Sequence, residues 1–359
     1  MTVVIGREGG PTAGPTARLG ACRALDGSAG APLHLDVDRP HAVNVVGKRG
    51  SGKSYTLGVL AEELARRAGV TPVVVDPMGV FGSLRASAEG APVPATVVDA
   101  PAVPASALSP RAWCALVDLP PESGPGALVW QAAEAADSLA GMQAALEGVE
   151  APAATRRAAR NHLSLVGSWD VVADGGGTAP LSTPGVTVLD CSGLPRAGAN
   201  AVVRGVAETL YRRRVAGDCP RLPWLLVDEA HAFFEGVAAP GLRRLLTRGR
   251  APGVSTVLAT QRPSALPEVA VAQADVLLAH RLTAAADLEA LVAARPTYLE
   301  GDLAEGLPRR PGEVVAVDDG TESVHTARVR ERDTPHGGAS PRASEVAAEP
   351  PALTRRRDP

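Results

Sequence analysis

The stretch HAVNVVGKRGSGKS, residues 41–54, decides the fold of this chain. Its first six residues form a mostly apolar run, which predicts a buried strand, and helical spacing of apolar residues begins near Lys53. Between them lies a glycine-rich loop that matches the pattern G-x-x-x-x-G-K-[ST] in full, from Gly47 to Ser54. A strand, a glycine-rich loop and a helix in this order predict backbone N–H groups that face an anionic ligand.

The residue types in this loop indicate ATP and Mg²⁺ as its ligands. Gly50 and Gly52 allow the backbone to wrap closely, Lys53 would reach the β- and γ-phosphates, and Ser54 would bind Mg²⁺. Lys48 and Lys53 are the only lysines among 36 basic residues, and a slender lysine suits a phosphate loop better than a planar guanidinium. The alternative is a glycine-rich turn without a nucleotide. The predicted nucleotide-binding residues are Gly47, Lys48, Arg49, Gly50, Ser51, Gly52, Lys53, Ser54 and Tyr55.

An acidic pair follows another apolar run, LPWLLVDE at residues 222–229. Acidic residues at the end of a buried parallel strand lie at the carboxyl edge of the sheet, beside the phosphate loop. We expect Asp228 to hold Mg²⁺ through water and Glu229 to orient and deprotonate an attacking water. Such a pair favours hydrolysis over phosphoryl transfer to a small molecule. The alternative is a strand that simply ends in a charged turn, and we assign His231 a structural role.

Three further polar residues are candidates for catalysis. Gln261 ends an apolar run, where it would contact the γ-phosphate or the lytic water, or else lie in a surface turn. Arg248 and Arg250 follow a predicted short helix over 240–248, and either could cross a subunit interface to the γ-phosphate of a neighbour. The alternative for both arginines is that they complement the negative end of the helix macrodipole.

The order of the predicted elements favours an α/β fold with a mostly parallel sheet flanked by helices, because strands and helices alternate from residue 41 onward. An amphipathic pattern at 127–149 and helical residues at 154–168 predict a helical insertion at about 127–168. The predicted strands cover residues 41–46, 71–76, 184–190, 222–229, 253–261 and 274–282, and a hairpin covers 312–330.

The chain divides into three parts in this interpretation. Residues 1–40 form a short N-terminal β element, residues 41–330 form the main domain, and residues 331–359 form a disordered tail. On the helix that follows the phosphate loop, two i,i+4 ion pairs are expected on the exposed face, namely Glu62–Arg66 and Glu63–Arg67.

The composition excludes several classes of protein. The net charge of −3 gives no general attraction to nucleic acid, so DNA contacts would need a local arginine patch. Arginine clusters at 156–160 and 212–214 could supply one, although clusters of this kind more commonly form the solvated face of a helix. Four scattered cysteines lack the spacing of a zinc site or a disulfide framework. No signal peptide and no apolar run of about 20 residues is present, so we expect a cytoplasmic protein without a membrane segment.

Four stretches together resemble the HerA/FtsK superfamily of P-loop ATPases, and more closely its archaeal HerA-like branch, the DUF87-type ATP-binding proteins. They are VVGKRGSGKSYTLGVLAEEL, VVVDPMGVF, LLVDEAHAFF and RGRAPGVSTVLATQRPSALP, which lie in the family's order within about residues 41–330. The resemblance implies a RecA-like ASCE core that assembles as a homo-hexameric ring and translocates double-stranded DNA at the expense of ATP. It also implies a nuclease partner in DNA end resection.

The resemblance also implies roles for individual residues. Lys53 and Ser54 fall on the nucleotide and Mg²⁺ positions, and Gln261 falls on the polar sensor. The remaining matches are Asp228 and Glu229 for the Walker B pair, and Arg248 or Arg250 for the arginine that acts in trans. Two departures stand out. HerA-like proteins carry an N-terminal β-barrel that about 40 residues cannot supply in full, and Val80 occupies a position that is often acidic.

The leading hypothesis is an Mg²⁺-dependent ATPase motor that acts on double-stranded DNA, in repair or end resection. One alternative is an ATPase of the same core that moves protein or serves a secretion or conjugation apparatus. Another is a nucleotide-binding regulatory module with little turnover. A small-molecule kinase is a more distant alternative, because no acceptor-site motif is visible.

Overall fold

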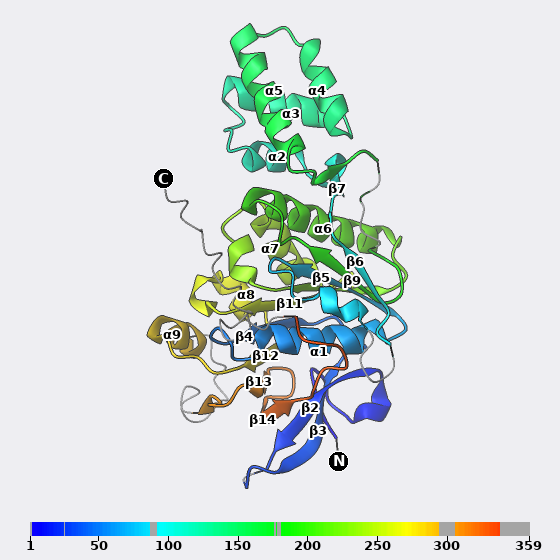
Figure 1. The fold of residues 1–359 in the computed structure, drawn as a ribbon, viewed down its shortest axis with the longest axis vertical. Coiled ribbons are helices and arrows are strands. Elements are labelled where there is room, and N and C mark those ends of the chain that lie inside the picture. Colours follow the sequence, from blue (N-terminus) through cyan, green and yellow to red (C-terminus); the bar gives the residue numbers. More distant parts are fainter. Residues whose placement is uncertain are drawn as a thin grey trace, which may run out of the picture.

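The computed structural model describes residues 2–24, 26–86, 92–175, 177, 181–293 and 306–337. Among these residues, twelve strands form one mixed sheet in the order β1-β3-β2-β14-β13-β12-β4-β11-β10-β5-β9-β6 (Figure 1). A small separate ladder pairs β7 (Val103–Pro104) with β8 (Val172–Ala173). In chain order the strands of the large sheet are β1 (Val3–Ile5), β2 (Thr16–Arg23), β3 (Ala29–Asp36), β4 (Ala42–Val46), β5 (Val70–Asp76), β6 (Ala95–Val98), β9 (Val186–Asp190), β10 (Leu222–Val227), β11 (Ser255–Thr260), β12 (Val276–Ala279), β13 (Glu313–Asp318) and β14 (Ser323–Val329).

The half of the sheet from β12 to β6 is parallel throughout. Within it, β11 lies between β4 and β10, so the strands that precede the phosphate loop, the glutamine and the acidic pair are consecutive. Since the carboxyl ends of parallel strands meet at one edge, these three motifs are brought together there. The predicted fold class, an α/β fold with a mostly parallel sheet flanked by helices, is confirmed.

The strands of this half are apolar on both faces because both faces are covered. Val73 and Val75 of β5 point into one core and Val74 points into the other, as the period of two requires. All three side chains are fully buried. Continuous runs of valine and leucine, without polar alternation, are typical of parallel strands buried in this way.

Helices lie on both faces of the sheet. Leu57, Leu60 and Leu64 of α1 belong to one core, whereas Val206 of α6 and Leu242 of α7 belong to the other. The left-handed Gly217 ends α6. The helices are α1 (Lys53–Ala65), α2 (Pro110–Leu116), α3 (Gly124–Ala135), α4 (Leu139–Glu147), α5 (Ala153–Gly167), α6 (Arg196–Ala216), α7 (Ala239–Arg248), α8 (Glu268–Ala272) and α9 (Ala285–Ala293).

The helices α2 to α5 form a bundle at one end of the molecule, beyond α6 (Figure 1). This bundle starts at Pro110, earlier than the predicted insertion, because Ser109 caps α2 by accepting a hydrogen bond from the Ala112 N–H. The apolar pattern at 127–149 is divided between two helices. Ala136 is extended, and Ser138 begins α4 by accepting from the Gly141 N–H.

The N-terminal strands join the main sheet, since β14 pairs with β2 and β2 pairs with β3. Residues 331–337, assigned above to a disordered tail, instead pack against α1, where Glu62 accepts hydrogen bonds from the backbone N–H groups of Asp333 and Thr334. This part of the prediction is wrong, because these residues satisfy a buried carboxylate. The remainder of the predicted tail, residues 338–359, lies outside the described residues.

The same contact corrects the expected charge pairs on α1. Glu63 does pair with Arg67, at 2.9 Å. Glu62, however, is fully buried and pairs with Arg330 and Arg332, whereas Arg66 pairs with Asp333. Elsewhere, the four cysteines are free thiols, and no helix in the described ranges is both long enough and apolar enough to span a membrane.

A buried histidine joins the N-terminal strands to the parallel core. His41, just before β4, lies 3.2 Å from Asp36 at the end of β3 and 2.7 Å from Asp275 before β12. Burial alone would lower the pKa of His41, but the hydrogen bonds and negative charges of Asp275 and Asp36 outweigh it and raise this pKa to about 9. The imidazolium is therefore part of the folded structure.

This pair of contacts makes stability depend on pH. The pKa of His41 is higher in the folded state, so its contribution is complete below the unfolded value of 6.5 and is lost as the pH rises through about 9. We expect the free energy of unfolding to fall by up to about 3 kcal/mol between these values. In His41→Gln, chemical denaturation should show a lower stability and a flatter profile over this range. His162→Gln, on α5, is the control, and parallel profiles for wild type and His41→Gln would contradict the assignment.

Candidate functional site

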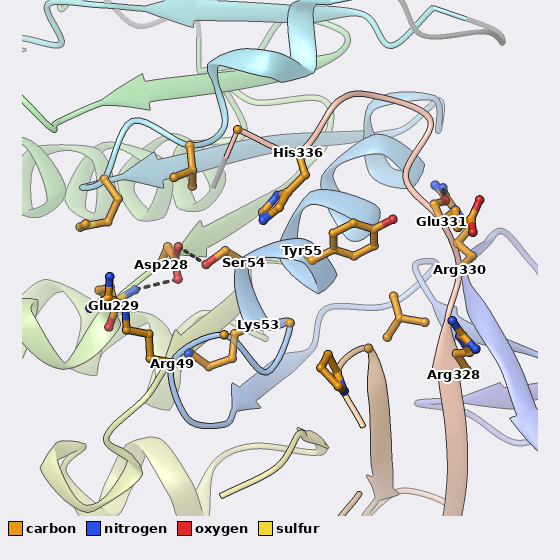
Figure 2. A pocket seen from close by; sticks show the side chains of 18 residues that line it. Arg49, Lys53, Ser54, Tyr55, Asp228, Glu229, Arg328, Arg330, Glu331 and His336 are labelled. Carbon is orange, nitrogen blue, oxygen red and sulfur yellow. Dashed lines mark hydrogen bonds between the residues drawn. The ribbon is translucent and has the colours of Figure 1, made fainter. Parts of the chain in front are cut away.

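The phosphate loop lines a cavity of about 690 Å³ at the carboxyl edge of the sheet (Figure 2). The cavity brings the loop together with Asp228 and Glu229, with Met78 and Val80 after β5, and with the chain around β13 and β14. Six of the nine predicted loop residues line it, namely Arg49, Gly50, Gly52, Lys53, Ser54 and Tyr55. The other three, Gly47, Lys48 and Ser51, shape the loop from behind.

Backbone hydrogen bonds from three sides fix the loop. The Gly47 N–H donates to the carbonyl of Thr260, and the Lys48 N–H donates to the carbonyl of Arg281. The carbonyl of Ser51 accepts from the Gly312 N–H at 3.1 Å. The loop is thus tied to the ends of β11, β12 and the start of β13, which orders its backbone before any ligand binds.

Glycine is required where the loop turns into the helix. Gly52, immediately before α1, has φ +115°, and Gly50 has φ +74°, both in the region that other residues avoid. A Cβ on Gly52 would also lie 3.2 Å from the His280 ring. With these turns in place, α1 starts at Lys53, and its first N–H groups point into the cavity, where an anion is stabilised.

Ser54 and Asp228 are in direct contact, although 174 positions separate them in the sequence. The Ser54 hydroxyl donates to Asp228 Oδ2 at 2.8 Å. Burial raises the pKa of Asp228, against the lowering effect of the Ser54 hydrogen bond. A hydroxyl and a carboxylate oxygen side by side are the ligand types that Mg²⁺ prefers.

Glu229 holds its carboxylate in the cavity through an unusual backbone conformation. Its φ of +46° is left-handed, which costs about 1 kcal/mol or more in a residue other than glycine. Burial raises the pKa of this carboxyl, opposed by the charge of Lys53 and by a hydrogen bond with Gln261. Gln261, at the end of β11, therefore lies beside Glu229. The neighbouring His231 contacts Thr260 Oγ1 at 3.1 Å and Glu229 Oε2 at 3.4 Å.

Lys53 completes the group of charges. Its side chain is almost fully buried, and its ammonium donates to the carbonyl of Lys48 at 3.2 Å. Burial lowers the pKa of Lys53, whereas the charges of Glu229 and Asp228 raise it. A cation that has left water and has few fixed partners is poised to bind a phosphate oxygen.

The two candidate arginines lie away from this cavity. Arg248 is exposed at the end of α7. Arg250 donates to the carbonyl of Gln273 and lies 3.4 Å from Asp275, before β12 and at the edge of the sheet opposite the phosphate loop. Neither acts on the site of its own chain in this arrangement, so a role in a neighbouring subunit stays a prediction.

The arginine cluster at 212–214 has local partners. Arg212, Arg213 and Arg214 each donate to a backbone carbonyl, of Ser106, Asp218 and Pro252 respectively. These contacts fix the end of α6 and the loops around it, which favours a structural role over contact with DNA.

Sequence reasoning missed two features of the site. His280, directly after β12, lies behind the loop and hydrogen-bonds the Thr56 hydroxyl of α1 at 3.0 Å. Burial, helped by the charge of Lys53, lowers the pKa of His280 to about 4, so the ring is neutral. The second feature is the chain after β14, of which residues 328–331, His336 and Gly337 line the cavity. A lone histidine and a segment beyond a hairpin carry no local pattern that could have identified either one.

Comparison with known families supports the motif analysis. Residues 21–143 match the DUF87 family, described as "Helicase HerA, central domain". This match contains the phosphate loop and α1, and it covers about a third of the chain. A comparison with curated proteins found no significant match.

Solved structures of similar fold extend over nearly the whole chain. VirB4 of Thermoanaerobacter pseudethanolicus has a TM-score of 0.67 at 18% identity, over 92% of this chain and 98% of that chain. The bacterial conjugative coupling protein TrwB has a TM-score of 0.57 at 16% identity, over 85% of this chain and 89% of that chain. A second form of TrwB, in complex with sulphate, has a TM-score of 0.54 at 15% identity, over 90% of this chain and 97% of that chain.

The fold and the site define a P-loop protein, in which a phosphate loop and an acidic strand end meet at one edge of a parallel sheet. The resemblance that the motifs indicated is confirmed to this extent: residues 21–143 match the HerA central domain, and the fold is similar to those of VirB4 and TrwB.

The packing behind the loop can be tested at Gly47. A Cβ there would lie 2.5 Å from Ser51 Oγ and 2.6 Å from His280 Cβ, which β12 holds in place. Gly47→Ala should therefore lower the free energy of unfolding by about 1–3 kcal/mol, measured by chemical denaturation. Gly82→Ala is the control, because nothing lies within 4 Å of its added Cβ. Equal stabilities of the two variants would show that the loop is not packed as described.

Proposed function

We propose that this protein is an Mg²⁺-dependent ATP hydrolase. The observation that carries the proposal is the 2.8 Å contact between Ser54 and Asp228, with Lys53 and Glu229 lining the same cavity. This set contains a cation for the phosphates, oxygen ligands for a metal, and a carboxylate for the water. Each of these groups is needed to cleave a phosphoanhydride bond; Lys53 and Ser54 come from the start of α1, and Asp228 and Glu229 come from the end of β10.

The residues at this position fit Mg²⁺. The Ser54 hydroxyl and the Asp228 carboxylate are hard oxygen ligands. No group of three or more His, Cys, Asp or Glu side chains within the described part of the chain could hold a metal alone. That agrees with Mg²⁺ bound jointly by protein, water and phosphate oxygens. When bound, Mg²⁺ would neutralise charge on the β- and γ-phosphates.

The residues of the chain account for the hydrolytic step. Lys53 and the loop N–H groups hold the triphosphate, and Glu229 accepts a proton from water. The water oxygen then bonds to the γ-phosphorus while the bond from that phosphorus to the β–γ bridging oxygen breaks, giving ADP and inorganic phosphate. The raised pKa of Glu229 makes it a stronger proton acceptor. Gln261, beside Glu229, is suited to position the water or to sense the γ-phosphate.

We propose further that hydrolysis drives movement on double-stranded DNA in the cytoplasm, by a homo-hexamer. The family description, a central domain of the helicase HerA, supports this reading. The exposed Arg248 and Arg250 are available to a neighbouring subunit, where either could reach the γ-phosphate. A nuclease partner and a role in DNA repair or end resection extend the same proposal.

The main alternative is an ATPase of the same core that serves a conjugation or protein-transfer apparatus. The similarity to the conjugative coupling protein TrwB, over most of both chains, favours this alternative. A regulatory module with little turnover is the third reading, and it gives no role to the Glu229 carboxylate that lines the cavity beside Gln261.

Glu229→Gln separates a hydrolase from a binding module. The amide keeps the size of the side chain but cannot accept the proton, so kcat for ATP hydrolysis should fall about 10²–10⁴-fold. ATP affinity, measured by calorimetry, should change little. Glu235→Gln is the control, since Glu235 is exposed and pairs with Arg196 on the surface. If Glu229→Gln hydrolyses ATP at the wild-type rate, the catalytic assignment is wrong.

The DNA motor is tested by the response of the ATPase rate to duplex DNA. We expect duplex DNA to raise this rate severalfold, and the effect to weaken as salt increases, because phosphate contacts release counterions. Size measurement with an ATP analogue and duplex DNA should reveal a ring near six subunits. If duplex DNA leaves the ATPase rate unchanged at every salt concentration, the DNA-motor hypothesis is excluded and the conjugation or protein-transfer hypothesis is favoured.

A further inference from the structure

The cavity continues well beyond the groups that would hold a triphosphate. Its far wall is formed by Pro311, Gly312, residues 328–331, His336 and Gly337. We call residues 330–337 the C-terminal strap. Figure 2 shows the strap leaving the end of β14, passing over α1 and reaching His336, which lies above Ser54 and Tyr55. A cavity of about 690 Å³ falls in the range of about 300–1,000 Å³ that is typical of whole small-molecule ligands.

A buried carboxylate on α1 anchors the strap. Glu62 is fully buried, and its two oxygens accept from the backbone N–H groups of Asp333 and Thr334, both at 3.0 Å. The Thr334 hydroxyl donates to Glu62 at 2.7 Å. Arg330 and Arg332 lie 3.0 and 3.3 Å from the same carboxylate and balance its charge. A buried charge with this many partners strongly disfavours release of the strap.

The strap brings two aromatic rings to the wall of the cavity. The Tyr55 hydroxyl accepts from the Arg332 N–H at 2.7 Å. The ring of His336 meets the ring of Tyr55 edge to face, with centroids 5.4 Å apart and planes at 69°. Both rings line the cavity (Figure 2). At its end the strap reaches the loop after β5, since a Cβ on Gly337 would lie 2.8 Å from the Val80 carbonyl oxygen.

The chain at the start of the strap is joined to the phosphate loop by hydrogen bonds through Gly312. The Gly312 N–H donates to the Ser51 carbonyl at 3.1 Å, and the Gly312 carbonyl accepts from the Val329 N–H at 2.8 Å. These two bonds run from the loop to the end of β14, where the strap begins. The two parts of the cavity therefore keep a fixed spacing, as a site for one elongated ligand requires.

The direction of the ligand follows from the order of the residues. Figure 2 shows Asp228 and Glu229 on one side of Ser54 and Tyr55 on the other, so a triphosphate with its γ-phosphate beside the acidic pair would run along the loop N–H groups toward Tyr55. The nucleoside then leaves on the side of Tyr55, toward the strap.

We propose that the C-terminal strap forms the nucleoside-binding end of the site, with Tyr55 and His336 in contact with the base. Glu62 is the positioning residue that holds the strap there. This inference rests on the proposed function, because it assigns the part of the cavity beyond the phosphates to the nucleoside of the same ATP molecule. Nucleobases stack on aromatic side chains with little dependence on base type, so the two rings supply affinity for a nucleoside.

The test compares two ligands that differ only beyond the phosphates. Dissociation constants for ATP and for inorganic tripolyphosphate, each with Mg²⁺, are measured by calorimetry on the full chain. His336→Ala changes an exposed side chain, and we expect it to weaken ATP binding about five- to tenfold. Binding of tripolyphosphate should change less than about twofold, which is about 0.4 kcal/mol. His162→Ala, in the helical bundle, should bind both ligands as the wild type does.

A second variant acts through the anchor. Glu62→Gln keeps the shape of the side chain but removes the buried charge that pairs with Arg332 and that accepts from the Asp333 and Thr334 N–H groups, so it should reproduce the selective loss of ATP affinity. Glu62→Asp, which restores the charge, should recover part of it. If both His336→Ala and Glu62→Gln leave ATP binding intact, or weaken both ligands equally, the strap does not hold the nucleoside.

Lys53→Ala separates failure of this inference from failure of the proposed function. It should weaken ATP and tripolyphosphate alike, because it acts on the phosphates. If Lys53→Ala leaves both affinities unchanged, the cavity is not a triphosphate site at all. If it weakens both while the strap variants show no selective effect, the proposed function stands and the nucleoside lies elsewhere.

Discussion

The contact between Ser54 and Asp228 is the interaction on which the site depends. It joins the first turn of α1 to the end of β10 at 2.8 Å. The two residues can meet only because β4, β11 and β10 are consecutive and parallel, with Val46 paired to Thr260 and Val227 to Leu258. Any change in strand order would separate Ser54 from Asp228. The packing of the apolar strands therefore fixes the positions of the polar residues that follow them.

Burial is the largest influence on the pKa of each of three ionisable groups in the site. Burial raises the pKa of Asp228 and Glu229 and lowers the pKa of Lys53, so every charged form is disfavoured. A triphosphate would favour the ammonium form of Lys53, and a divalent cation would favour the carboxylate form of Asp228. Binding of the two together would thus stabilise charges that burial penalises, so a cation and an anion are expected to bind as a unit.

Local patterns in the sequence were sufficient for the motifs and for the parallel core. The phosphate loop, the acidic pair and Gln261 each follow an apolar run, and the parallel sheet gathers the ends of such runs at one edge. The surroundings were not predictable in this way. Glu62 has an arginine four positions away, the usual sign of an exposed pair, yet its partner Arg332 lies 270 positions along the chain. No local sequence pattern indicates so distant a partner. A polar, proline-containing segment is predicted to be disordered from its composition, whether or not it pairs with a buried charge in the fold.

The scarcity of lysine has a practical consequence for chemistry on this molecule. Lys48 and Lys53 carry the only side-chain amines, and Lys53 is 5% exposed in the cavity beside two carboxyls. Reagents that acylate amines attack the neutral form, and burial lowers the pKa of Lys53 and so increases that form. Covalent modification of side-chain amines is consequently confined to one short loop, and a mass spectrum of a single peptide would record whether that loop is occupied.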